Sequence, residues 1–117
     1  MSYGIAIAPD GKTVYVSNYY QNNVSVINTT TNTVTGTLYI AFPYGVAVAP
    51  DGTKVYVVSS VGRVVFAFDT ITNAMIGQPP ASVIPDGYTP IGGAVSPNGK
   101  KLYVTSTNGT TGAGAYV

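Results

Sequence analysis

The chain has 117 residues, five basic and four acidic side chains, and neither histidine nor cysteine. Only 8% of its residues are charged, against about 25% in an average domain, which excludes the clustered basic surface of a nucleic-acid binder. The composition also excludes a disulfide framework and sites built on histidine or cysteine, and proline and glycine interrupt every apolar run, so membrane insertion is not expected.

A phrase of thirteen residues occurs three times along the chain. It reads "AIAPDGKTVYVSN" at 6–18, "AVAPDGTKVYVVS" at 47–59 and "AVSPNGKKLYVTS" at 94–106. The aligned tyrosines, Tyr15, Tyr56 and Tyr103, lie 41 and 47 residues apart, a period typical of propeller blades or of helical repeats. Apolar residues alternate with period 2 and are β-branched or aromatic, so the pattern predicts strands and no helix.

The alternating segments predict an all-β fold of antiparallel four-stranded propeller blades, forming an incomplete propeller in a single chain. The chain is expected to be one propeller segment, with blade one at 3–40, blade two at 44–84 and a partial blade three at 90–117. The expected strands are 4–8, 13–17, 24–28 and 33–40 in blade one; 45–49, 54–59, 63–68 and 74–78 in blade two; and 91–96, 101–106 and 113–117 in blade three.

The first two strands of each repeat are joined by a short turn with a proline, an Asp or Asn and a glycine. Proline suits the second position of a type I turn, and glycine can take the left-handed conformation that closes a bulged hairpin. A second turn, "DTITN" at 69–73, begins with an aspartate that can bond backbone N–H groups. The residues expected to build turns are Pro9, Asp10, Gly11, Pro50, Asp51, Gly52, Asp69, Pro97, Asn98 and Gly99.

The chain offers little for catalysis. All four acidic residues are aspartates in turn sequences, where a structural role explains them. Asp10 and Asp51 occupy equivalent positions of adjacent blades, and glycosidases need two such carboxylates, but turn tips lack the burial that raises a pKa. We therefore expect no catalytic, metal-binding or cofactor-binding residues.

The irregular segments are expected to share one rim, opposite the regular turns. These segments are 18–23, 59–62, 107–112 and the long crossover 78–90, and variable loops on a rigid scaffold often bind partners. Loops with no binding role would show the same variation, because nothing restrains their sequence. The candidate binding residues of this rim are Tyr19, Tyr20, Gln21, Asn22, Arg63 and Tyr88. The other tyrosines in or beside strands are expected to pack: Tyr3, Tyr15, Tyr39, Tyr44, Tyr56 and Tyr103.

The order of motifs resembles the YVTN-type β-propeller repeat. The first repeat contains "PDGKTVYV", then "VSVINTTTN", then an apolar strand and "PYGVAV", and its version of the name-giving tetrapeptide is Tyr15-Val16-Ser17-Asn18. The resemblance implies a prokaryotic surface-layer or cell-surface protein, similar to lactonase-like propellers. Members of that family usually carry about seven blades, whereas this chain carries fewer than three.

The end blades are expected to leave apolar faces open, since propellers close rings of roughly four to eight blades. We therefore expect a homo-oligomer, either a dimer or a head-to-tail filament, with surface glycans or proteins as further partners. The expected function is that of a non-enzymatic, extracellular or cell-surface scaffold without a signal in this sequence. The alternatives are a fragment of a larger lactonase-like or ligand-binding propeller, or a repeat fragment with no activity of its own.

Overall fold

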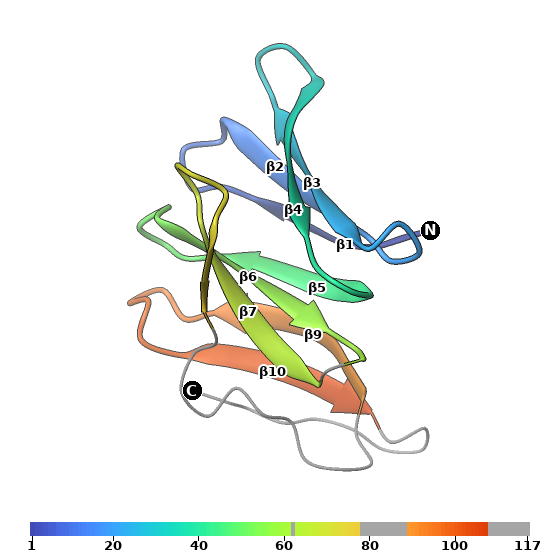
Figure 1. Ribbon diagram of the computed structural model, residues 1–117. Coiled ribbons are helices and arrows are strands. Elements are labelled where there is room, and N and C mark those ends of the chain that lie inside the picture. The colour runs from blue at the N-terminus through green and yellow to red at the C-terminus, as the bar shows by residue number, and fades with distance from the viewer. Residues whose placement is uncertain (62, 78–88, 108–117) are drawn as a thin grey trace.

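The computed structural model describes residues 1–61, 63–77 and 89–107, and these residues form three antiparallel sheets stacked side by side (Figure 1). No helix occurs among them, so the expected all-β fold of four-stranded blades is confirmed. Blade one consists of β1 (Ser2–Ile7), β2 (Thr13–Asn18), β3 (Asn23–Asn28) and β4 (Thr33–Tyr39). Blade two consists of β5 (Pro43–Val48), β6 (Lys54–Ser59), β7 (Val64–Asp69) and β8 (Met75–Gly77), and blade three shows β9 (Thr89–Val95) and β10 (Leu102–Thr107).

The strands follow one another in space as they do in sequence, in the order β1-β2-β3-β4 and β5-β6-β7-β8. The first strands of the three blades, β1, β5 and β9, lie next to one another and hold the stack together. The third strand expected for blade three, at 113–117, lies outside the described residues, as does most of the crossover 78–90.

The expected strand limits are wrong by one or two residues at most ends, and the backbone explains the clearest cases. The third strand of blade two begins at Val64 and not at 63, because Arg63 has φ 53° and cannot belong to the extended ladder. The first strand of blade one ends at Ile7, because the amide of Ala8 already bonds the Thr13 carbonyl within the turn (2.8 Å).

Each blade begins with the same irregularity. In blade one, Tyr3 and Gly4 together oppose Ser17, because Ser2 pairs with Asn18 and Ile5 pairs with Val16. The register shifts at the equivalent place in β5 and in β9. Such a bulge turns a side chain away from its regular direction, so each blade presents one residue of its first strand at the rim.

The core consists of two apolar layers, one between each pair of neighbouring blades. The first layer contains Tyr15, Val24, Val26, Leu38 and Ile40 of blade one and Val46, Val55, Val57 and Phe68 of blade two. The second contains Ala47, Val58 and Val65 of blade two and Leu102 and Val104 of blade three. Because alternate residues of a strand point to opposite faces, blade two, which lies between the other two, contributes to both layers.

Candidate functional site

The repeated turns form the first rim. The amides of Gly11, Gly52 and Gly99 close the three turns onto the carbonyls three residues earlier (2.8–2.9 Å), and all three glycines have φ between 72° and 76°. Only glycine adopts this region without strain. The geometry is that of the bulged type I hairpin expected from the sequence.

The Asp and Asn side chains of these turns have backbone partners. Oδ1 of Asp10 accepts a hydrogen bond from the Lys12 amide (2.8 Å), and Oδ1 of Asn98 accepts one from the Lys100 amide (3.0 Å). Oδ1 of Asp51 accepts bonds from both the amide (2.9 Å) and the hydroxyl (2.7 Å) of Thr53. These bonds hold the pKa of the Asp51 carboxyl below its ordinary value.

The second turn of blade two uses the same chemistry. Oδ1 of Asp69 accepts hydrogen bonds from the amides of Thr72 (3.0 Å) and Ile71 (2.8 Å), which lower the pKa of its carboxyl. The hydroxyl of Thr70 donates to the carbonyl of Gly52 (2.6 Å) and so ties this turn to the first. All three turn aspartates among the described residues therefore have the local role that their positions in the repeat indicate.

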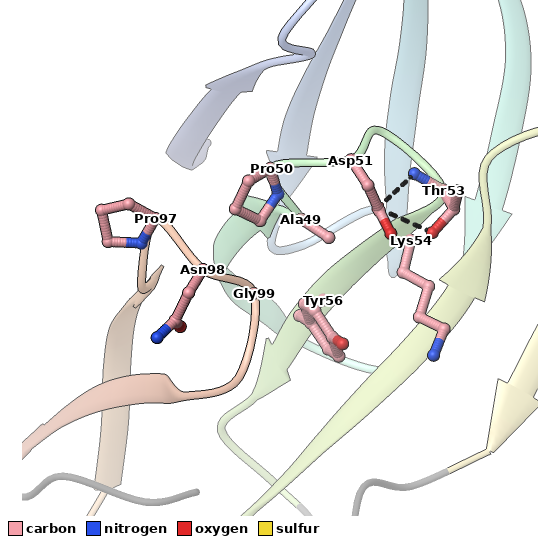
Figure 2. Close-up of a pocket in the computed structure, with 9 residues that line it drawn as sticks. All are labelled: Ala49, Pro50, Asp51, Thr53, Lys54, Tyr56, Pro97, Asn98 and Gly99. Atoms are coloured by element: carbon pink, nitrogen blue, oxygen red, sulfur yellow. Dashed lines mark hydrogen bonds between the residues drawn. The ribbon is translucent and has the colours of Figure 1, made fainter.

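A shallow pocket lies at each blade joint on this rim. The pocket between blades two and three has a volume of about 330 Å³. Figure 2 shows Tyr56 below Pro50 and Asp51, with Asn98 to one side. The equivalent pocket between blades one and two, about 380 Å³, is lined in part by Tyr15, Asp10 and Asp51. Burial and the charge of Asp10 raise the pKa of the Tyr15 phenol.

The acidic side chains that line these pockets are engaged by their own turns. Asp10 and Asp51 line the larger pocket together, but both accept hydrogen bonds from the backbone of their own turns. These bonds lower the pKa of Asp51, whereas a general acid requires a raised pKa. Within residues 1–61, 63–77 and 89–107, no group of three or more His, Cys, Asp or Glu side chains is placed to hold a metal ion. In this same part of the chain, no helix has the length and apolar character needed to cross a membrane.

The irregular loops 18–23 and 59–61 meet at the opposite rim, while most of the other expected rim segments, 107–112 and 78–90, lies outside the described residues. The amide of Tyr19 bonds the carbonyl of Met1 (3.0 Å), the amide of Ile40 bonds the carbonyl of Asn22 (3.2 Å), and the amide of Ser60 bonds the carbonyl of Phe42 (3.2 Å). These bonds join four segments at one rim: the chain start, the two loops between second and third strands, and the crossover from blade one to blade two. Blade connectivity predicts this arrangement.

Five aromatic side chains gather on this second rim; we call them the aromatic rim cluster: Tyr3, Tyr19, Tyr20, Phe42 and Tyr44. Tyr3 of blade one stacks on Tyr44 of blade two, with ring centroids 4.3 Å apart. Tyr19 meets the other four rings edge to face, at centroid distances of 5.0–5.5 Å. The cluster therefore ties blade one to blade two and also presents aromatic surface to solvent.

The candidate binding residues have different environments within this rim. Tyr20 is 64% exposed, and its ring meets that of Tyr19, which is itself half-buried. Asn22 supports the backbone, because its Oδ1 accepts a bond from the Phe42 amide (3.0 Å). Gln21 is exposed and Arg63 is half-buried, and Tyr88 lies outside the described residues.

Sequence reasoning assigned Tyr3 and Tyr44 to packing and did not identify Phe42. Tyr3 is in fact exposed at the rim, because the bulge turns it out of the ladder. Partial desolvation of Tyr3 within the cluster raises the pKa of its phenol, and the neighbouring phenols, Tyr20 first, add to this rise. One sequence feature could have indicated the pair: in the first two repeats a tyrosine directly precedes the first glycine, as Tyr3-Gly4 and Tyr44-Gly45.

Close backbone contact between first strands defines the joints between blades. A Cβ atom on Gly4 would lie 2.6 Å from the Tyr44 carbonyl oxygen and 3.2 Å from Cα of Gly45. A Cβ on Gly45 would lie 2.6 Å from Cα of Gly92 in blade three. At the first joint Ser17 also donates from Oγ to the Tyr44 carbonyl (2.6 Å) and accepts from the Gly4 amide (2.7 Å).

Among the described residues, no further blade covers the outer faces of blades one and three. Ile5 is 69% exposed, whereas its equivalent in blade two, Val46, is 6% exposed. Tyr103 is 45% exposed, whereas its equivalent Tyr15 is 1% exposed. The expectation that Tyr103 packs is therefore wrong for this chain, as it is for the exposed Tyr39, while Tyr15 packs as expected.

Comparison with known proteins supports the architecture alone. No known family profile matches the chain, and no curated protein matches it. Among solved structures, hydrazine synthase of Kuenenia stuttgartiensis, which has a β-propeller domain, matches with a TM-score of 0.80 and 25% sequence identity. The match covers 99% of this chain and 36% of that one, so the chain spans about a third of the neighbour's length.

Proposed function

We propose that this protein is a non-enzymatic scaffold of the extracellular space or cell surface, a YVTN-type propeller module that works by assembling with further copies of itself. The observation that carries the proposal is the pair of open blade faces. Ile5 and Ile7 are exposed on blade one where the equivalent Val46 and Val48 of blade two are packed against a neighbour. Large exposed apolar patches mark interaction surfaces.

The size of a blade face fits association of intermediate strength. If each of the two open faces buries about 400 Å² of apolar surface on association, about 800 Å² is removed from water in total. This burial stabilises the complex by about 20 kcal/mol before the costs of association. Association costs about 4–15 kcal/mol in lost freedom. The surplus predicts an assembly whose mass depends on protein concentration.

The second rim gives such a scaffold an adhesive surface. The aromatic rim cluster offers the exposed rings of Tyr3 and Tyr20 on a base fixed by Tyr19 and Tyr44, and tyrosine is a rigid contact residue with a polar tip. The rim loop 18–23 carries no charged residue, which favours uncharged partners such as surface glycans over ionic ones.

Light scattering coupled to size-exclusion chromatography tests the assembly. We expect a mass that rises with concentration from that of the 12.0 kDa chain to that of an oligomer. A folded species that stays at 12.0 kDa over the whole concentration range contradicts the proposal.

Retention on immobilised neutral polysaccharide tests the adhesion. Tyr20→Ser should reduce retention, whereas Ile71→Ser, which changes an exposed apolar residue of the opposite rim, should not. Equal retention of both variants contradicts adhesion through the aromatic rim cluster.

A second candidate is a segment of a larger lactonase-like or ligand-binding propeller. The observation in its favour is that the chain matches only 36% of a longer propeller-containing protein. Further copies of the thirteen-residue phrase in the flanking coding sequence would support it. If neither assembly nor flanking repeats are found, the third alternative applies: a repeat fragment without activity of its own.

A further inference from the structure

The three blades are joined by a repeated glycine contact. Gly4, Gly45 and Gly92 follow the bulge residue of β1, β5 and β9, and the missing side chain of each of the first two points at the backbone of the next blade. The separation is so small that a Cβ atom would lie 2.6 Å from a backbone atom at both joints. The contact therefore sets both the distance and the register between blades.

The third glycine of the series faces no further blade within the described residues. Among the described residues, the one heavy atom within 4 Å of a Cβ atom on Gly92 would be Oγ1 of Thr105, at 3.0 Å. Thr105 occupies the position that Ser17 has in blade one, where Oγ of Ser17 lies 3.1 Å from the equivalent point on Gly4. Blade three thus repeats the half of the joint that blade one presents to blade two.

Blade one carries the other half of the same joint, unoccupied. On blade two, the half that faces blade one consists of the carbonyl of Tyr44, the backbone of Gly45 and the side chain of Val46. The equivalent groups on blade one are the carbonyl of Tyr3, the backbone of Gly4 and the exposed side chain of Ile5.

We infer that blade three of one copy docks on blade one of a second copy, through the same contact that joins blades one and two. Gly92 then lies against the backbone of Gly4 in the second copy, and Oγ1 of Thr105 donates to the carbonyl of Tyr3. Ile5 of the second copy covers Tyr103, as Val46 covers Tyr15 within the chain. This inference rests on the proposed self-assembly and adds the surface, the register and the occupant.

The same joint also extends the aromatic rim. Ile91 is the bulge residue of β9 and is exposed, so the docked copy places its Tyr3 beside Ile91, as Tyr3 lies on Tyr44 within one chain. A closed pair of chains contains two such joints, with about six blades, which is within the range of closed propellers.

Gly92→Ala tests the joint, with Gly93→Ala as its control. Among the described residues of its own chain, the added methyl of Gly92→Ala meets a threonine hydroxyl alone, but it would overlap the backbone of the second copy. The added methyl of Gly93→Ala has its nearest neighbour, the Tyr103 carbonyl, at 3.4 Å, an ordinary contact. Overpacking of this kind predicts a tenfold to hundredfold weaker association for Gly92→Ala. No comparable change is expected for Gly93→Ala. Sedimentation velocity over a dilution series measures both.

A charge placed on the opposite half gives an independent measurement. Ile5→Lys should weaken association at least tenfold, because a lysine would be buried against Tyr103. Ile71→Lys changes an apolar residue that is 89% exposed outside the joint and should leave association unchanged. Circular dichroism of each variant at the lowest concentration verifies that its monomer is folded.

The outcomes separate the two proposals. A wild-type chain that stays at 12.0 kDa refutes self-assembly as a whole. A wild-type chain that associates while Gly92→Ala associates equally tightly overturns the glycine joint and leaves self-assembly standing. A plateau at twice the chain mass, lost in both Gly92→Ala and Ile5→Lys and retained in both controls, supports the joint in its closed form.

Discussion

Gly45→Ala should destabilise the folded chain at the joint between blades two and three. The new Cβ atom would lie 2.6 Å from Cα of Gly92, 3.1 Å from its carbonyl carbon and 3.2 Å from the amide nitrogen of Gly93. All three are backbone atoms of β9, which cannot rotate away as a side chain can. Since carbon atoms pack best at about 3.5–4.0 Å, the two strands must separate by roughly 1 Å.

A separation of about 1 Å weakens the whole apolar layer of that joint. Gaps of about 0.5–1 Å forfeit roughly a quarter to a half of the dispersion energy of the facing atoms, and the layer includes the buried Val58, Val65 and Val104. Overpacked sites of this kind lose about 1–3 kcal/mol. For a chain of this length, each kcal/mol lowers the melting temperature by about 4 °C, so a fall of about 4–12 °C is expected.

Thermal unfolding followed by circular dichroism, at one fixed protein concentration, measures this fall. Gly93→Ala is the control, because its added Cβ finds no atom closer than 3.4 Å and both substitutions restrict the unfolded chain equally. If Gly45→Ala melts at the temperature of Gly93→Ala, the first strands do not touch as described and the glycine joint is not what holds the blades.

Three further predictions concern the joint and the rims. Tyr19→Ala should lower the free energy of unfolding by about 2 kcal/mol or more in urea titrations, because it removes four ring contacts, whereas Tyr20→Ala should change it little. Ser17→Ala should cost about 1–3 kcal/mol in the same titration, because the part-buried carbonyl of Tyr44 and the part-buried amide of Gly4 lose their partner. Hydrogen bonds at their turns lower the pKa values of Asp51 and Asp69 below the unfolded value of 3.8. Both carboxylates therefore stabilise the folded chain above pH 3.8, and this stabilisation is lost as the pH falls through the lower folded values. The melting temperature should therefore drop in acid, and less steeply in Asp51→Asn; equal slopes for both proteins would contradict this account.

The repeat made the local structure predictable. The Pro-Asp-Gly turns, the alternating strands and the blade order follow from the chemistry of two or three adjacent residues, and the structure has them where the pattern placed them. Strand limits were less accurate, because a single backbone angle such as φ 53° at Arg63 moves them. That angle depends on the loop around the residue and leaves no periodic trace in the sequence.

The candidate site was only partly predictable. Blade connectivity correctly brought the described irregular loops, 18–23 and 59–61, to one rim. The sequence could not indicate that Tyr3 stacks on Tyr44, 41 residues later. That contact depends on a bulge in each first strand and on the distance between blades. A bulge appears in the sequence only as one additional residue, which the hydrophobic pattern tolerates.

The sequence by itself determined the all-β class, the blades and the turn chemistry, because these depend on short-range conformational preference repeated three times. Only the tertiary structure decided which residues face a neighbour and which face solvent. Tyr15 and Tyr103 stand at the same place in the repeat, yet one is buried and the other is 45% exposed. The difference arises because burial depends on the next blade, and the described part of blade three has no further blade against it.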